Sequence, residues 1–179
     1  TQMGMDVMGT SPTKKCGEYF RANVWWWSPL WDYCDQVAPE ICGQVEHAYS
    51  NDGDGLDEHD SKALATVLLK EHKAGNTKKY QDERDAELKA LPDLECNYCN
   101  GTGKRTWHSD DKGKKEKDFG GEPLTAEELK IYTKSDVRQC NGCSGKGTRR
   151  PWASDYGFDA DFVKQFARFL RYSGGFSIY

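Results

Sequence analysis

The stretch CNYCNGTG at residues 96–103 returns in altered form as CNGCSGKG at residues 140–147. Both copies follow the pattern C-x-x-C-x-G-x-G. Two thiolates separated by two residues can hold one edge of a tetrahedral site from a tight turn, because zinc–sulfur bonds are only about 2.3 Å long. Two such turns supply four thiolates and leave no open position. The repeat therefore predicts one structural Zn²⁺, bound by Cys96, Cys99, Cys140 and Cys143.

Glycines follow the second cysteine of each copy, at Gly101, Gly103, Gly145 and Gly147. Glycine adopts positive φ at little cost, so the backbone can turn back and direct N–H groups at the sulfurs. A redox-active pair needs only one C-x-x-C, usually at the start of a helix, and these glycine-rich stretches do not start helices well. The seven cysteines, an odd number, also disfavour a disulfide framework and favour a reducing compartment.

The repeated motif resembles that of the cysteine-rich domain of DnaJ-type chaperones. That family carries four repeats and two zinc ions, whereas this chain has two repeats, enough for one zinc. The resemblance covers only residues 96–103 and 140–147, and it implies the metal site and a local hairpin fold. The His-Pro-Asp tripeptide of the J-domain is absent from the sequence, so no co-chaperone activity is implied.

Composition and charge limit the classes of function. Hydrophobic residues make up 36% of the chain and no apolar run approaches the roughly 20 residues that span a bilayer. No secretory signal is recognisable, so we expect a cytoplasmic protein. The net charge of −4 disfavours nucleic acid as the main partner. The charge is uneven, however: residues 95–152 carry 12 Lys/Arg against 9 Asp/Glu, and residues 1–94 carry 10 against 17.

Turn signals and apolar periodicity predict a mainly helical α+β domain with an embedded four-cysteine zinc-knuckle subdomain and short strands. We expect a helical N-terminal region at residues 1–94 and a zinc-binding subdomain with an inserted loop and helix at residues 95–151. A C-terminal helix and strand at residues 152–179 should then pack back on the N-terminal region.

Local capping signals predict where two helices begin. Ser28 followed by Pro29 is typical of an N-cap with proline at the first helical position. Thr125 with Glu128 forms the sequence of a capping box. The first half of the stretch 104–139, which separates the two cysteine motifs, is charged and contains glycine, so we expect it to be a mobile loop.

The acidic stretch NDGDGLDEHD at residues 51–60 resembles the opening of an EF-hand calcium loop. In that register the twelfth position, which needs a bidentate glutamate, is Ser61. We therefore interpret the stretch as a glycine turn, followed by Asp57 or Asp60 as the cap of a helix. The sequence contains no recognisable catalytic motif, so an enzyme or small-ligand binder that uses residues 52–60 is a further alternative.

The consecutive Trp25, Trp26 and Trp27 are candidates for a partner-binding surface, because tryptophan is enriched at binding hot spots. No single helix or strand face can bury all three. Trp31 follows closely in the same segment. We predict that at least two of these four tryptophans are buried against Phe166 or Phe169 of the C-terminal helix. Any tryptophan left exposed is then the best candidate for the partner contact.

The order of motifs along the whole chain is similar to that in a group of uncharacterised small proteins of bacteriophages and prophages. These motifs are GEYFRANVWWWSPLWDYC, NDGDGLDEHDSKALA, the paired cysteine motifs, RRPW and FARFLRYSGGF. The resemblance implies a phage protein in the bacterial cytoplasm. We expect it to bind a host protein, to counter a defence system or to redirect host machinery. The alternative is a zinc-dependent nucleic-acid-associated protein that uses Lys104, Arg105, Arg149 and Arg150.

Overall fold

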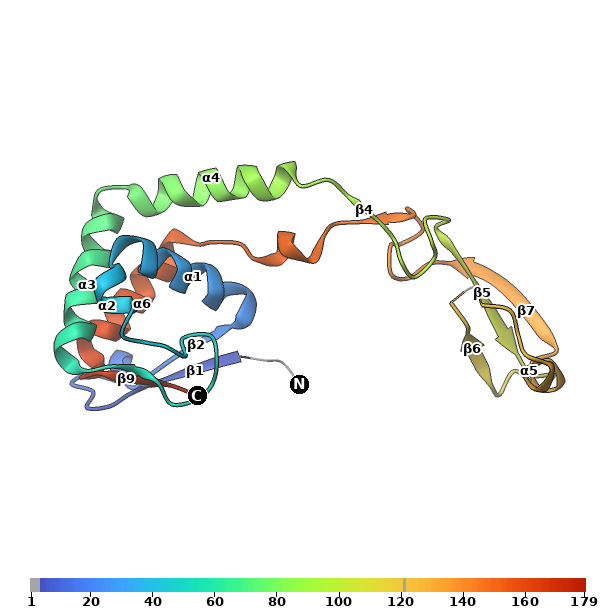
Figure 1. The fold of residues 1–179 in the computed structure, drawn as a ribbon, viewed down its shortest axis with the longest axis horizontal. Coiled ribbons are helices and arrows are strands. Elements are labelled where there is room, and N and C mark those ends of the chain that lie inside the picture. Colours follow the sequence, from blue (N-terminus) through green and yellow to red (C-terminus); the bar gives the residue numbers. More distant parts are fainter. Residues whose placement is uncertain (1–3, 121) are drawn as a thin grey trace. The chain divides into compact units, whose positions relative to one another are not determined.

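The computed structural model describes residues 4–120 and 122–179, which form two compact units (Figure 1). The larger unit joins the residues up to 90 with residues 152–179, and the smaller unit is residues 91–151. The described residues contain both helices and short strands, so the predicted α+β class is confirmed.

The larger unit contains an antiparallel sheet with the strand order β2-β1-β9-β3. The strands are β1 (Gly4–Gly9), β2 (Tyr19–Asn23), β3 (Gly55–Leu56) and β9 (Phe176–Ile178). The last strand of the chain, β9, lies between the first, β1, and the short β3, and pairs with both. The sheet therefore ties the C-terminus to segments far away in the sequence.

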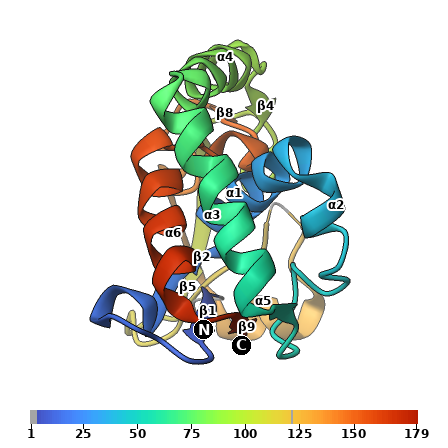
Figure 2. The same cartoon turned by 90° about the vertical axis from the view of Figure 1, so that its left-hand side faces the viewer.

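The helices of the larger unit are α1 (Val24–Val37), α2 (Pro39–Cys42), α3 (Glu58–Lys73), α4 (Asn76–Ala90) and α6 (Ala160–Ser173). Helices α3 and α6 lie side by side (Figure 2). Helix α6 begins at Asp159, whose carboxylate accepts hydrogen bonds from two backbone N–H groups, and ends at Gly174, which has φ +64°. Its apolar residues recur at helical spacing, so one face of α6 is buried in the core.

The core of the larger unit is built around aromatic side chains from α1 and α6. Trp27 is fully buried and lies 5.6 Å from Phe166 and 5.5 Å from Trp31 between ring centroids. Trp31 is 3% exposed and contacts Phe176 of β9. Two of the four tryptophans are therefore buried, as predicted. The predicted contact with the C-terminal helix is confirmed for Trp27, whereas Trp31 contacts β9.

The predicted start of α1 is wrong. The helix begins five residues earlier, because the side chain of Asn23 accepts a hydrogen bond from the N–H of Trp26 at 3.1 Å and caps it. Ser28 and Pro29 lie inside the helix, where proline cannot donate the hydrogen bond to the preceding turn.

The smaller unit contains the two-stranded sheet β4-β8 and the three-stranded sheet β6-β5-β7. The elements are β4 (Leu94–Glu95), β5 (Lys104–Ser109), β6 (Glu116–Asp118), α5 (Ala126–Ile131), β7 (Lys134–Gln139) and β8 (Thr148–Arg149). The capping box of Thr125 and Glu128 is confirmed at the start of α5.

The prediction of a mobile loop in the first half of residues 104–139 is wrong, because much of this segment forms β5 and β6. Pairs across the strands explain how so polar a segment is ordered. Arg138 of β7 makes a bidentate ion pair with Glu116 of β6, at 2.9 and 3.1 Å. Arg105 pairs with Asp118, and the guanidinium groups of Arg105 and Arg138 lie 5.9 and 5.6 Å from the centroid of the Trp107 ring.

Candidate metal centre

Each cysteine motif folds into a tight turn that directs a backbone amide at a sulfur. The N–H of Gly103 donates to Sγ of Cys99 at 3.3 Å, and the N–H of Gly147 donates to Sγ of Cys143 at the same distance. Gly101, Gly103, Gly145 and Gly147 have φ between +71° and +78°, a conformation that side chains disfavour. The structure thus confirms the predicted role of these glycines.

The two turns are also joined to each other by the backbone. The N–H of Cys96 donates to the carbonyl of Gly147 at 2.8 Å, and the N–H of Cys140 donates to the carbonyl of Gly103 at 2.9 Å. Each motif therefore bonds the other in the same way, and the pair is close to symmetric. These two backbone hydrogen bonds hold the two turns side by side.

The four sulfurs meet at the spacing that a tetrahedral metal ion requires. The Sγ atoms of Cys96 and Cys140 are 3.9 Å apart, and those of Cys99 and Cys143 are 3.7 Å apart. All four sulfurs lie within 4.8 Å of one another. A tetrahedron with metal–sulfur bonds of about 2.3 Å has an edge of about 3.8 Å. The four cysteines could therefore hold one metal ion.

Burial and hydrogen bonding act in opposite directions on the thiols. Burial raises the pKa of Cys99 to about 11. At Cys143 burial also raises the pKa, but the amide of Gly147 and the neighbouring thiols outweigh it and lower the pKa to about 7. Sulfurs this close repel one another when ionised, so a cation is needed for all four to be thiolates.

The cysteine cluster is also the hydrophobic core of the smaller unit. Among the described residues of this unit, the buried hydrophobic side chains are the four cysteines, and the large apolar side chains nearby, such as Leu94, Tyr98 and Val137, are exposed. Apart from the largely buried pair of Arg105 and Asp118, the ion pairs of the polar strands are exposed, and exposed pairs stabilise proteins little. The bound metal is therefore expected to be the main source of order here.

A Gly103→Ala substitution is expected to lower metal affinity at least tenfold. The new Cβ would collide with the carbonyl oxygen of Gly145 and would carry the strain of φ +71°. Gly113→Ala is the matched control, because Gly113 has φ +65° and a Cβ there meets nothing within 4 Å. The backbone strain of about 1–2 kcal/mol is common to both variants. Competition with a chromogenic chelator measures the metal affinity of both variants. Equal affinities would contradict the role assigned to the close approach of the two turns at Gly103.

The four basic candidates of the smaller unit are engaged in different ways. The side chain of Arg105 is only 17% exposed and is paired with Asp118. Arg150 donates to the carbonyl of Leu91 at 2.5 Å and to Asp93 at 3.3 Å. Arg149 lies over the ring of Tyr98, 5.3 Å from its centroid, and Lys104 is exposed. Two of the four therefore already have carboxylate partners.

The three consecutive tryptophans separate into buried and exposed groups. Trp27 cannot contact a partner because it is fully buried, with its indole N–H donating to the carbonyl of Ala48 at 2.7 Å. Trp25 and Trp26 are 39% and 40% exposed. Sequence reasoning missed Trp152, which is 65% exposed and belongs to the same unit. Trp152 lies far from Trp25 in the sequence, so nothing in the sequence indicates that both rings contact Tyr156.

The acids of residues 51–60 are used to organise the backbone. Asp57 caps α3, as predicted, by accepting the N–H of Asp60 at 2.8 Å. Asp54 accepts the N–H of His47 at 2.9 Å, and this bond lowers the pKa of the Asp54 carboxyl. Asp57, His59 and Asp60 lie close enough to share a metal ion, but they are largely exposed. The structure thus gives these acids local structural roles.

No known protein family, curated protein or solved structure matches the chain. In the part of the chain that the structure describes, none of the helices is both long and apolar enough to cross a membrane. The resemblances to DnaJ-type repeats and to phage proteins therefore stay predictions. The conclusions about function depend on the geometry of the residues themselves.

Proposed function

We propose that this chain is a phage-encoded zinc protein that binds a protein of the bacterial host in the cytoplasm. The observation that carries the metal assignment is the cluster of four buried sulfurs at tetrahedral spacing. The phage origin rests on the order of sequence motifs. The binding function rests on the exposed aromatic residues of the larger unit.

The donor set favours Zn²⁺ in a structural role. Four thiolates in a tetrahedron suit zinc, and a closed set of four protein ligands has no position for water or substrate. Cys96, Cys99, Cys140 and Cys143 would hold one ion, and the amides of Gly103 and Gly147 would stabilise the thiolate charge. The ion would fasten the ends of the β5–β7 sheet.

Four side chains form the proposed contact, which we call the aromatic surface: Trp25, Trp26, Trp152 and Tyr156. The ring of Tyr156 lies 4.8 Å from that of Trp25 and 5.3 Å from that of Trp152, both edge to face. Trp26 lies beside Gly157 and contacts Phe162. Clustered aromatic side chains that are held by their neighbours yet remain exposed are typical of protein-binding surfaces.

The charges favour a protein over nucleic acid as the partner. The larger unit carries 13 Lys/Arg against 19 Asp/Glu, and the smaller unit carries 12 against 10. Four thiolates with one Zn²⁺ would add a charge of −2 to the smaller unit. Arg105 and Arg150, two of the candidate phosphate contacts, already pair with carboxylates. A strong salt-dependent attraction to phosphates is therefore not expected.

Replacing both Trp25 and Trp152 by alanine is expected to abolish capture of the host partner. Tagged protein is incubated with nuclease-treated bacterial lysate, and captured proteins are identified by mass spectrometry. We expect the affinity for the purified partner to fall about a hundredfold or more, because each exposed aromatic anchor contributes about 1–2 kcal/mol or more. The melting temperature should change little.

Met8→Ala is the control, because Met8 is 45% exposed on β1 of the same unit and lies outside the aromatic surface. It should bind the partner like the unchanged protein. A partner that is lost on nuclease treatment, or binding to oligonucleotides at sub-micromolar affinity in physiological salt, would replace this proposal with the nucleic-acid alternative.

A further inference from the structure

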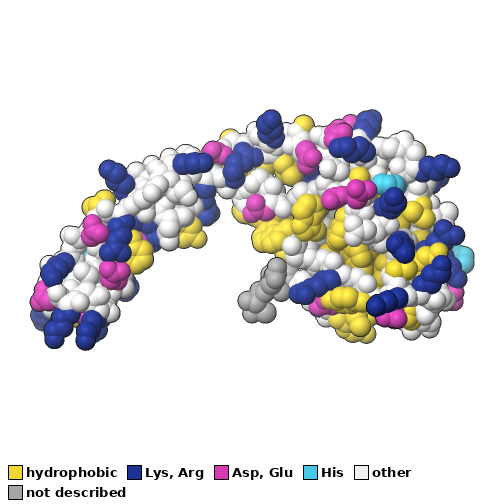
Figure 3. Space-filling model, turned by 180° about the vertical axis from the view of Figure 1, so that it is seen from behind, with side chains coloured by type: hydrophobic (Ala, Val, Ile, Leu, Met, Phe, Trp, Pro, Cys, Tyr) yellow, Lys and Arg dark blue, Asp and Glu magenta, His cyan; other side chains and the backbone are white. Residues whose placement is uncertain are grey.

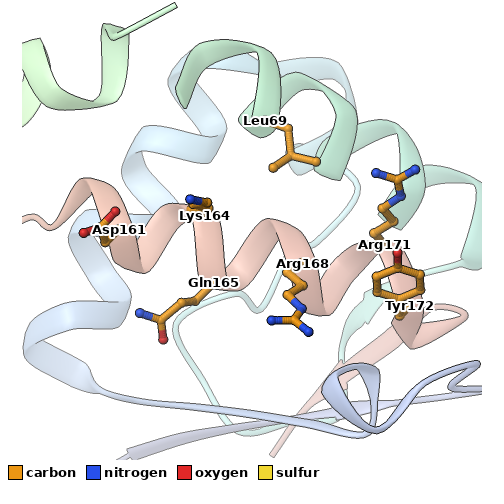
Figure 4. Close-up of a pocket in the computed structure, with 7 residues that line it drawn as sticks. All are labelled: Leu69, Asp161, Lys164, Gln165, Arg168, Arg171 and Tyr172. Atoms are coloured by element: carbon orange, nitrogen blue, oxygen red, sulfur yellow. The ribbon is translucent and has the colours of Figure 1, made fainter. Parts of the chain in front are cut away.

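The outer face of α6 carries a row of cations. Lys164, Arg168 and Arg171 are exposed and follow one another at the spacing i, i+4, i+7, so their backbone positions fall within one broad sector of the helix, from which the long side chains diverge (Figure 4). Within the described part of the chain, the side chains of Lys164 and Arg168 make no hydrogen bond or ion pair, and Arg171 contacts only the ring of Tyr172, 5.9 Å from its centroid. These charges are unneutralised in a unit that is acidic as a whole.

This row borders a groove between α6 and α3. A hollow of about 500 Å³ is lined by the three cations together with the half-buried Leu69 of α3 and Tyr172 of α6. A second hollow of about 620 Å³ shares Leu69, Arg171 and Tyr172 and continues toward Thr13. In Figure 4, Leu69 points from α3 toward α6, while Arg171 and Arg168 extend to opposite sides of α6. The groove thus has an apolar centre and cationic margins.

Further cations lie around this groove. Figure 3 looks onto the side of the larger unit where α6 lies, and there lysine and arginine side chains lie beside exposed hydrophobic ones, with acidic side chains among them. Lys14 adds a further positive charge, 4.1 Å from the centroid of the Tyr172 ring. A surface of this kind can bind a ligand that offers apolar groups and negative charges together.

We propose that this groove, defined by Leu69, Lys164, Arg168, Arg171 and Tyr172, binds an acidic amphipathic segment of a protein partner. An apolar side chain of the segment would occupy the hollow against Leu69 and Tyr172. The three cations extend over about 10 Å along α6. Carboxylates at i, i+4 and i+7 of a partner helix have the same spacing, so each can face one cation.

Charge and shape favour an acidic peptide over nucleic acid at this groove. A nucleic acid carries closely spaced phosphates well beyond the groove, where the acids of this unit would repel them. Asp161 lines the groove itself and would repel a continuous phosphate backbone, but it can pair with a cation of a peptide. The apolar centre also suits a side chain such as leucine. The groove is separate from the aromatic surface, so each proposal is tested without the other.

The test uses a fluorescein-labelled synthetic helix that carries glutamates at i, i+4 and i+7 and leucines on the adjoining face. Fluorescence anisotropy with the full-length protein should show saturable binding that weakens as salt is raised. The triple variant Lys164→Gln, Arg168→Gln, Arg171→Gln should bind about tenfold more weakly, since exposed ion pairs contribute modestly and add up. The same helix with glutamine in place of glutamate should show a similar loss.

The matched control is the triple variant Lys78→Gln, Lys79→Gln, Lys89→Gln on α4, which removes the same charge from the same unit. It should bind the acidic helix like the unchanged protein. Equal binding by the two triple variants would overturn the proposal, and so would equal binding of the glutamate and glutamine helices. Tighter binding of an oligothymidylate, lost in the α6 variant, would instead assign the groove to nucleic acid. Self-association lost in that variant would assign it to a second copy.

Discussion

Chelating the metal from the full-length protein is expected to unfold residues 91–151 while the larger unit keeps its fold. The reason is that the buried hydrophobic side chains described in the smaller unit are the four cysteines. Structural zinc contributes on the order of 10–16 kcal/mol in small zinc domains, more than most whole domains have in reserve. The larger unit has an aromatic core of its own and does not depend on the metal.

Tryptophan indole signals report on the two units separately. Trp107 is the one tryptophan in residues 91–151, where its ring lies close to the guanidinium groups of Arg105 and Arg138 on the three-stranded sheet. Trp27 is buried in the larger unit. Under a strong chelator, the indole N–H resonance of Trp107 should move to its unfolded position while that of Trp27 stays in place. Added zinc should reverse the change.

Single cysteine variants test the ligands. Cys140→Ser should lower the zinc content from about one ion per chain to well below half, because three thiolates bind zinc much more weakly than four. Cys16→Ser is the control, since Cys16 lies in the larger unit and outside the cluster. Unchanged zinc content in Cys140→Ser, or a dispersed Trp107 signal without metal, would contradict the metal-dependent fold.

The cluster of four cysteines could be predicted from the sequence because everything it needs is local and repeated. Each turn is specified by two cysteines and two glycines within eight residues, and the spacing alone says that two such turns complete a tetrahedron. The caps at Asp57 and at Thr125 were predictable for the same reason, since a cap depends on residues three positions away. Features formed by residues close together in the sequence, such as these turns and caps, can therefore be predicted from it.

The three-stranded sheet could not be predicted, because its stabilising contacts join residues far apart in the sequence. Glu116 and Arg138 are individually only polar residues in a charged stretch, and they form an ion pair only when β5 brings their strands together. The same holds for the aromatic surface, in which Tyr156 connects Trp25 to Trp152. At α1 the sequence pattern predicts a cap at Ser28, whereas Asn23 caps the helix.

Replacing Trp27 by alanine is expected to destabilise the larger unit by about 3–5 kcal/mol, the range for large buried aromatic residues. Trp27 is fully buried between Trp31 and Phe166, so the surrounding helices cannot close the space that its ring leaves. This cost is a large part of the roughly 5–15 kcal/mol by which domains are usually stable. Urea denaturation followed by circular dichroism, analysed for the transition of the larger unit, measures it.

Two further variants separate the causes of that loss. Trp27→Phe keeps much of the apolar volume but leaves the buried carbonyl of Ala48 without its donor, so it should cost about 1–3 kcal/mol. Trp25→Ala removes a ring of the same size from the exposed side of the same helix, and should change the free energy of unfolding by less than about 1 kcal/mol. If Trp25→Ala destabilised the protein as much as Trp27→Ala, Trp25 would belong to the core. The aromatic surface would then lose one of its members.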